Sequence, residues 1–284
     1  MAEEKINVNG TVITFFSTAS AVGKTLVSCN VAAELARLGH RVCLADLDLQ
    51  FGDVCNYLQL MPQQTLADAQ NAIHVQGDAF HVEQYLTMYT HDQTRFYVLA
   101  SPQRLDEAYN IQAAEVRKII QHLRSMFDYV LLDTTSMFSV LNLSMLDMST
   151  IVTFLGIVDF LPTIKNMKIG NDTLKNLNYD INKIRLVLNR SDSVTRISRE
   201  DVEELLGESF DYILPNDFKA ANRSIKDGVP LVLGGEQTPL VLGGEQTPLG
   251  DALCDMAAQY TNRGLDDEVY DEGNNNSWFS RLFH

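Results

Sequence analysis

The sequence has little of what metal-binding and membrane-spanning proteins use. Its 284 residues include four cysteines and six histidines, without a C-x-x-C pair or an H-x-x-x-H pattern, so a metal site built on Cys or His is not expected. Cys29 and Cys43 lie in apolar stretches, and we interpret both as reduced core residues. The richest apolar run, IVTFLGIVDFL at 151–161, is interrupted by Asp159 and is too short to span a bilayer.

Positive charge is also scarce. The chain has 22 Lys and Arg against 37 Asp and Glu, which gives a formal net charge of −15. A protein that binds nucleic acid through its phosphates needs a basic face, and no large cluster of Lys and Arg is present, so no nucleic-acid partner is expected. The opening residues MAEEKINVNG are polar and acidic, unlike a signal peptide. We therefore expect a cytoplasmic protein.

What is present is a regular alternation of short apolar runs and helical stretches. The runs are continuously apolar, which is typical of strands covered on both faces. Such alternation predicts an α/β fold, with a doubly wound, mostly parallel sheet flanked by helices in three layers. Ligands of these folds bind beyond the carboxyl ends of the strands. The predicted strands are 11–17, 41–46, 95–100, 128–133, 151–156, 184–189 and 211–215, and the predicted helices 24–38, 111–125, 160–178, 198–206 and 217–227.

The organisation along the chain predicts one domain followed by a tail. We expect the domain over 1–263, an acidic, asparagine-rich linker over 264–276 and a short amphipathic segment over 277–284. Within the domain, PLVLGGEQT at 230–238 is repeated letter for letter at 239–247. A repeat this short does not build a solenoid. We interpret it as a tandem duplication accommodated in a surface loop, because lengthening a loop costs little free energy.

The stretch STASAVGKT at 17–25 joins a predicted strand to a predicted helix that ends at Gly39. Backbone N–H groups at such a turn, together with the start of a helix, bind phosphate. A following Lys supplies charge to the β- and γ-phosphates, and a Ser or Thr hydroxyl holds Mg²⁺. Lys24 and Thr25 stand at those two places. The strand–turn–helix context therefore predicts a nucleotide-binding loop.

Two further predicted strands end in acidic residues. RVCLADLDLQFGD carries Asp46 and Asp48, and FDYVLLDTT carries Asp133. Each aspartate alone is typical of a helix cap or a turn. Beside Lys24 and Thr25, however, they indicate a Mg²⁺–triphosphate site, with one carboxylate serving the water shell of the metal and one lying near the attacking water.

This constellation resembles the MinD/ParA family of deviant Walker-A ATPases over nearly the whole chain. The family loop x-K-G-G-x-G-K-[ST] falls with its last seven positions on 19–25, its D-x-D motif on 46–48 and its second acidic strand end on Asp133. Its base-side Asn falls on Asn189 in LVLNRSD, and its late I-P-x-D…G-x-P signature on Pro215, Asp217, Gly228 and Pro230.

The resemblance implies ATP and Mg²⁺ as cofactors and a homodimer that forms on ATP. It implies Asp48 and Lys24 as catalytic residues, and Thr25, Asp48 and Asp133 around Mg²⁺, the aspartates through water. The implied nucleotide contacts are Ser20, Ala21, Val22, Gly23, Lys24, Thr25, Leu26, Asn189, Arg190, Pro215 and Asp217.

Within the family, the runs LDLQFGDVCNYL, LASPQRLDEA and KIRLVLNR look most similar to the CpaE/TadZ branch, whose ATPases localise type IV (Flp/Tad) pilus secretion machinery. That branch usually carries a receiver-like domain before the ATPase, and here ten residues precede the first predicted strand. Three other functions stay open: an ATP-bound scaffold without turnover, a MinD-like division-site regulator and a ParA-like DNA partition factor. The negative charge disfavours the last, and no motif for a second substrate supports a metabolic enzyme.

The loop departs from the family pattern at four positions. Ala19 replaces the signature Lys, whose charge reaches the phosphates of the partner, so the resemblance implies an ATPase of low turnover. Ser20 and Ala21 replace glycines, and a Cβ is disfavoured where φ is positive. We expect either altered dihedral angles or strain. Leu26 replaces a hydroxyl residue and removes one hydrogen bond to the α-phosphate.

The chain ends in SWFSRLFH. On a helix, four apolar side chains fall within an arc of about 140°, which resembles the C-terminal membrane anchor of MinD proteins. Because one short helix binds weakly, two copies in a dimer are expected to bind a membrane surface by avidity. Alternatively, the tail folds back or docks on a partner. The apolar residues are Trp278, Phe279, Leu282 and Phe283.

Overall fold

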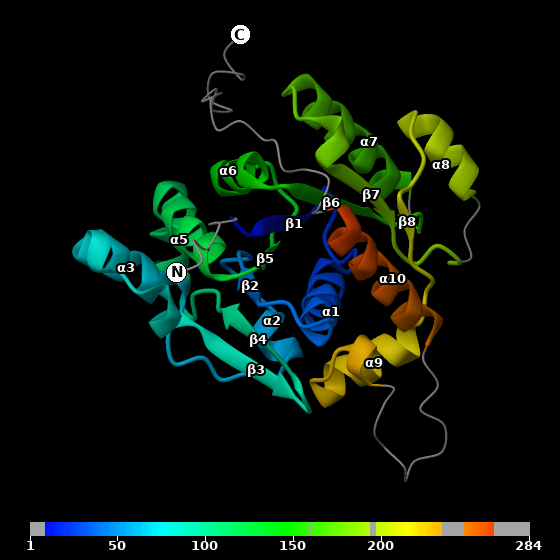
Figure 1. The fold of residues 1–284 in the computed structure, drawn as a ribbon. Coiled ribbons are helices and arrows are strands. Elements are labelled where there is room, and N and C mark those ends of the chain that lie inside the picture. The colour runs from blue at the N-terminus through cyan, green and yellow to red at the C-terminus, as the bar shows by residue number, and fades with distance from the viewer. Residues whose placement is uncertain (1–8, 160, 194–196, 235–246, 264–284) are drawn as a thin grey trace, which may run out of the picture.

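The computed structural model describes residues 9–159, 161–193, 197–234 and 247–263. Eight strands form one sheet in the order β3-β4-β2-β5-β1-β6-β7-β8 (Figure 1), and every neighbouring pair is parallel except β3 with β4. The strands are β1 Thr11–Ser17, β2 Val42–Asp46, β3 Thr87–His91, β4 Thr94–Leu99, β5 Tyr129–Asp133, β6 Ile151–Gly156, β7 Ile184–Leu188 and β8 Tyr212–Ile213.

Helices cover both faces of the sheet. They are α1 Lys24–Arg37, α2 Val54–Tyr57, α3 Leu66–Gln76, α4 Leu105–Tyr109, α5 Ala113–Met126, α6 Val140–Met148, α7 Leu161–Asn176, α8 Arg199–Leu206, α9 Phe218–Asp227 and α10 Pro248–Arg263. Short 3-10 turns are η1 Gly77–Ala79, η2 Val82–Tyr85, η3 Ile181–Lys183 and η4 Leu231–Leu233.

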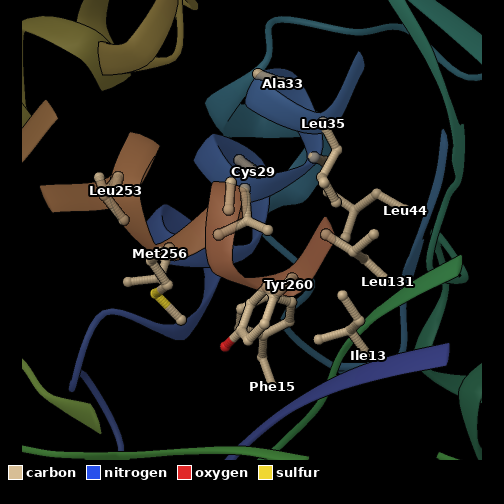
Figure 2. Close-up of a cluster of buried hydrophobic side chains, with 14 of the residues drawn as sticks. Ile13, Phe15, Cys29, Ala33, Leu35, Leu44, Leu131, Leu253, Met256 and Tyr260 are labelled. Atoms are coloured by element: carbon tan, nitrogen blue, oxygen red, sulfur yellow. The ribbon is translucent and has the colours of Figure 1, made fainter. Parts of the chain in front are cut away.

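The two helical layers bury alternate residues of the strands. Ile13 and Phe15 of β1 pack under α1 and α10, as Figure 2 shows, whereas Val12 and Phe16 face the layer that contains α3, α5, α6 and α7. The hydroxyl of Tyr260 in α10 also forms a buried 2.7 Å hydrogen bond with a threonine of β6. The core therefore lies on both sides of the sheet, which confirms the predicted three-layer α/β fold.

Each of the seven predicted strands is present; two have the predicted ends, and the ends of the others differ by at most two residues. The sequence pattern missed β3, α2, α3, α4 and α10. β3 is an edge strand with only one buried residue, so it lacks the continuous apolar run used to recognise the others. The segment 140–148, outside the predicted ranges, forms α6, in which Met145 and Met148 are buried.

The structure tests the predictions for the cysteines and for part of the duplicated segment, but not those for the linker and the tail. Cys29 and Cys43 are free and buried, as predicted. The first copy of the duplicated segment contributes η4, which packs against α1 and α10, but 235–246 lie outside the described residues. So do the whole predicted linker, 264–276, and the predicted amphipathic segment, 277–284. In the described part, no helix has both the length and the apolar character that a bilayer crossing requires.

Candidate functional site

The loop between β1 and α1 keeps two residues in the left-handed region. Gly23 has φ 97°, and a Cβ built there would lie 2.5 Å from Nδ2 of Asn189, so only glycine fits. Ala21 has φ 58°, a conformation that costs an L-residue about 1–2 kcal/mol. Of the two expectations for the replaced glycines, strain is the outcome at Ala21.

This loop presents unsatisfied donors at the start of a helix. The N–H groups of Ala21 and Gly23 have no hydrogen-bond acceptor within the described residues. They lie directly before the first turn of α1, whose N–H groups and dipole also favour an anion. The hydroxyl of Ser17 donates to the carbonyl oxygen of Ala19 over 2.7 Å and closes the base of the turn. The loop therefore has the properties of an anion site.

A cavity of about 850 Å³ opens beside the loop, within the size range of small-molecule sites. Eight of the residues predicted from sequence line it together, and Val22 lies beneath them, 1% exposed. The eight are Ser20, Ala21, Gly23, Lys24, Thr25, Leu26, Asp48 and Arg190.

Lys24 is the first residue of α1, and its side chain is half-buried in this cavity. Burial lowers the pKa of Lys24, while the charges of Asp133 and Asp48 act in the opposite direction. Among the described residues, its ammonium group has no hydrogen-bond or salt-bridge partner. A cation held in this way is available to an anionic ligand.

Asp133 lies at the end of β5, beside Thr25. Burial raises the pKa of Asp133 to about 7, although a hydrogen bond from the Thr25 hydroxyl and the charge of Lys24 lower it. Oδ1 of Asp133 is buried and has no partner in the described part of the chain. An orphaned carboxylate oxygen next to a hydroxyl is a set of ligands that suits the water shell of Mg²⁺, so the residues fit a bound magnesium ion.

The two aspartates of the D-x-D stretch have different surroundings. Asp46 is 1% exposed, and burial followed by the neighbouring charge of Asp133 raises its pKa. Its two oxygens accept hydrogen bonds from the N–H groups of Asp48 and Val54, both at 3.2 Å. Asp46 thus anchors the segment that follows β2. Asp48 is partly exposed and lines the cavity, where it can orient a water molecule.

Asn189 and Arg190 follow β7 and contact the loop from behind. Nδ2 of Asn189 donates to the carbonyl oxygen of Val22 over 2.8 Å, and its Oδ1 accepts the N–H of Arg190. Nη2 of Arg190 donates to the carbonyl oxygen of Ala21 over 3.1 Å. Asn189 is 4% exposed, so in this structure its amide serves the loop, and a contact with a nucleotide base stays a prediction.

The late signature is placed away from the cavity lining. Oδ1 of Asp217 accepts the N–H of Ala220 and caps α9, and neither Asp217 nor Pro215 is among the residues that line the cavity. Gly228 has φ 70°, with Gln59 against its Cβ position, and its carbonyl oxygen accepts the hydroxyl of Tyr89. This part of the signature fixes the end of α9 against the segment after α2.

A buried polar network connects that region to the nucleotide loop helix. The hydroxyl of Tyr57 accepts a hydrogen bond from Nδ2 of Asn30 in α1 and contacts Oγ of Ser224 in α9 at 2.6 Å. Oδ1 of Asn30 accepts the N–H of Val232 in η4. Because Tyr57 also lines the cavity, α1, α2 and α9 meet at its wall.

Sequence reasoning missed the wall formed by 135–142. Ser136 and Ser20 are joined by a 3.1 Å hydrogen bond between their hydroxyl groups, and Met137 lines the cavity while 61% exposed. Nδ2 of Asn142 donates to the carbonyl oxygens of Thr135 and Met137 and holds this loop. The available signal was the position of the loop directly after Asp133, at the carboxyl end of a strand.

Comparison with known proteins supports a nucleotide site. The family model described as the CobQ/CobB/MinD/ParA nucleotide binding domain matches residues 13–231. The chain is 28% identical over 228 residues to the septum site-determining protein MinD of Synechocystis, an alignment that covers 78% of this chain and 82% of that protein. It is 55% identical to the antiactivator FleN of Pseudomonas aeruginosa over 47 residues, which cover 16% of the chain and 17% of FleN.

Solved structures share the fold. A ParA family ATPase from Chlorobium tepidum superimposes with a TM-score of 0.76 at 21% identity, covering 87% of this chain and 98% of that one. MinD from Pyrococcus horikoshii, solved with Mg-ADP, gives a TM-score of 0.72 at 17% identity over 92% of this chain and 100% of that one. At these identities the likeness shows the common fold.

Proposed function

The chain belongs to the CobQ/CobB/MinD/ParA nucleotide-binding family, and from that membership we propose that its cavity binds ATP with Mg²⁺ and hydrolyses it slowly. One observation carries the proposal. The loop with unsatisfied N–H groups, the unpaired ammonium of Lys24 and the hydroxyl residue Thr25 line one cavity, and Thr25 is hydrogen-bonded to the buried Asp133 beside it. Among the structural neighbours, the Pyrococcus MinD was solved with Mg-ADP and a Borrelia partition protein with AMPPNP.

Each residue then has a defined task. Lys24 binds the β- and γ-phosphates, and the loop N–H groups hold the oxygens between them. Thr25 would hold Mg²⁺ and Asp133 its water shell, and the metal would neutralise phosphate charge when bound. Asp48 orients the attacking water. The nucleotide base is expected near Asn189 and Arg190, with Pro215 and Asp217 as further predicted contacts.

Slow turnover follows from Ala19. In this family position a lysine supplies a second cation, and cations supplied in trans to phosphoryl transfer are worth roughly 10³–10⁵ in rate. The same residue favours the second candidate, a scaffold of this fold that binds ATP without turnover. A single-turnover phosphate-release assay separates the two. Release that Asp48→Ala abolishes supports the ATPase, and release no faster than the buffer blank supports the scaffold.

We further propose that the protein is a nucleotide-dependent homodimer that positions a membrane-associated assembly, namely type IV (Flp/Tad) pilus or secretion machinery. The runs that resemble the CpaE/TadZ branch support this role. A MinD-like division-site regulator is the alternative, supported by the Synechocystis and Bacillus subtilis MinD relatives; a MinD of Aquifex aeolicus was solved in complex with MinC. A DNA partition role is disfavoured by the net charge of −15.

The test is the oligomeric state with and without ATP and Mg²⁺, measured by light scattering after gel filtration. We expect a monomer without nucleotide and a dimer with it, and Lys24→Ala should stop the shift. Lys118→Ala is the matched control, since Lys118 lies on the surface of α5 and pairs with Glu115. Equal masses with and without nucleotide would remove the switch while leaving ATP binding open to direct titration.

A further inference from the structure

The nucleotide loop is tied to the strand behind it by two consecutive peptide groups. The carbonyl oxygen of Val22 accepts Nδ2 of Asn189 at 2.8 Å, and that of Ala21 accepts Nη2 of Arg190 at 3.1 Å. Both donors stand directly after β7, far from the loop in sequence. These two bonds are therefore tertiary contacts that decide how the loop is oriented.

The orientation of a carbonyl decides that of the next N–H group. In a trans peptide, C=O and N–H point in opposite directions. Tying the carbonyl of Ala21 to Arg190 turns the N–H of Val22 away from Arg190, and tying the carbonyl of Val22 to Asn189 turns the N–H of Gly23 away from Asn189. An anion cradle needs N–H groups that point inward in this way.

Ala21 makes such support necessary. Its φ of 58° is in the left-handed region, which glycine adopts freely and alanine disfavours. A glycine at this position would adopt the conformation without steric cost. With alanine, contacts outside the loop have to hold it, and the hydrogen bond from Arg190 acts on the carbonyl of the strained residue itself.

The guanidinium of Arg190 is itself oriented by a carboxylate. Nη1 lies 3.6 Å from Oδ2 of Asp159, and the two side chains are 38% and 20% exposed. Asp159 follows β6, the strand next to β7 in the sheet. One arm of the planar fork thus contacts Asp159 while the other reaches Ala21, a geometry that a lysine cannot reproduce.

We infer that Arg190, oriented by Asp159, is a positioning residue for the nucleotide loop: it holds Ala21 in its left-handed conformation and so keeps the N–H groups directed at the phosphates. The inference rests on the proposed function, because it concerns how the same cavity binds ATP. It assigns a role to Asp159, which no motif in the sequence indicated.

The first test is the affinity for ATP with Mg²⁺, measured by calorimetric titration. Arg190→Met keeps the apolar stem and should weaken binding roughly tenfold, as the loss of a hydrogen bond from a charged group predicts. Asp159→Asn should weaken it in the same direction. Arg199→Met is the control, because it removes the same charge from the surface of α8, where Arg199 pairs with Glu200, and it should bind like wild type.

The affinity of Asp159→Asn for ATP also distinguishes the positioning role from a direct contact between Arg190 and the phosphates. If the guanidinium bound phosphate itself, freeing it from Asp159 would leave the affinity unchanged or make it tighter. That outcome, or wild-type affinity in Arg190→Met, would overturn the inference.

A second substitution tests the mechanism. Because glycine needs no support at positive φ, the loss caused by Arg190→Met should shrink to less than about threefold when Ala21 is also replaced by glycine. A loss of equal size with Ala21 and with Gly at this position would show that Arg190 acts by some route other than the conformation of Ala21.

Hydrogen exchange of the nucleotide-free protein separates this inference from the proposed function. In Arg190→Met the amide of Val27, which donates to the carbonyl oxygen of Gly23 in the loop over 3.0 Å, should exchange faster than in wild type, while the amides of β5 stay the same. If wild type binds no ATP, the proposed function fails, and the exchange comparison still decides whether Arg190 holds the loop. Unchanged exchange at Val27 would refute the positioning role.

Discussion

Replacing Asp133 with asparagine should stabilise the nucleotide-free protein at high pH. Burial raises the pKa of Asp133 to about 7 from an ordinary value of 3.8, so between these two pH values the folded state holds a proton that the unfolded chain has released. Stability therefore falls as the pH rises through this window and stays low above it. At 1.36 kcal/mol per pKa unit, the loss at pH 8 is at most about 4 kcal/mol.

Asparagine has nearly the same shape and no charge, so Asp133→Asn should remove this loss. The substitution also removes the negative charge that helps to raise the pKa of Asp46. Against this, Lys24 loses a neighbouring carboxylate, which offsets part of the gain. We expect the variant to gain about 2–3 kcal/mol relative to wild type between pH 5 and pH 8.

Urea unfolding of both proteins at pH 5, 6, 7 and 8, without nucleotide or Mg²⁺, measures this difference. The free energy of unfolding of wild type should fall between pH 5 and pH 7 more steeply than that of Asp133→Asn. A difference between the two proteins that is the same at every pH would refute the reasoning, because it would show that Asp133 does not titrate in this range.

Three further predictions concern other parts of the chain. Tyr260→Phe and Thr153→Val each break the buried 2.7 Å hydrogen bond between α10 and β6, and each should lower the free energy of unfolding by about 1–3 kcal/mol. In urea unfolding, the double variant should lose clearly less than the sum of the two single losses. Deleting 239–247 should leave the melting temperature unchanged, because the first copy of the repeat already packs against α1 and α10 and shortening a loop changes little; a large drop in a thermal scan would contradict this. Removing 277–284 should abolish flotation with anionic vesicles in the presence of ATP and Mg²⁺, and flotation equal to that of the full chain would refute the membrane role of the tail.

The fold could be predicted from the sequence because its central strands are buried on both faces. β1, β2, β5 and β6 are runs of apolar residues with few exposed positions, and such runs are visible without knowledge of their neighbours. β3 and α10 could not be recognised in this way. β3 has the mixed pattern of an edge strand, and α10 directly follows a duplicated segment that obscures where the helix begins.

The site could be predicted where chemistry depends on residue type, and less well where it depends on tertiary contacts. Lys24, Thr25 and Asp48 were found by their type and spacing, and all three line the cavity. Ser136 hydrogen-bonds directly to Ser20 of the loop, and Asp159 acts on the loop through Arg190. Both are distant from the loop in sequence, so no local pattern reveals them. Asn189 was found by resemblance, but its hydrogen bond to Val22 is a fact of packing.

The charges around the cavity explain why binding and turnover have different requirements. ATP carries about four negative charges. Mg²⁺ supplies two positive charges, Lys24 supplies one, and the start of α1 supplies about half of one. The bound nucleotide is therefore nearly neutralised without a residue at the position of Ala19. Arg190 adds little, because Asp159 already pairs with it. During phosphoryl transfer, negative charge develops on the oxygen that leaves, and a cation placed next to it accelerates the reaction. The family pattern that the sequence resembles has a lysine where this chain has Ala19, so under the proposed function we expect rapid turnover to need a cation brought by another molecule.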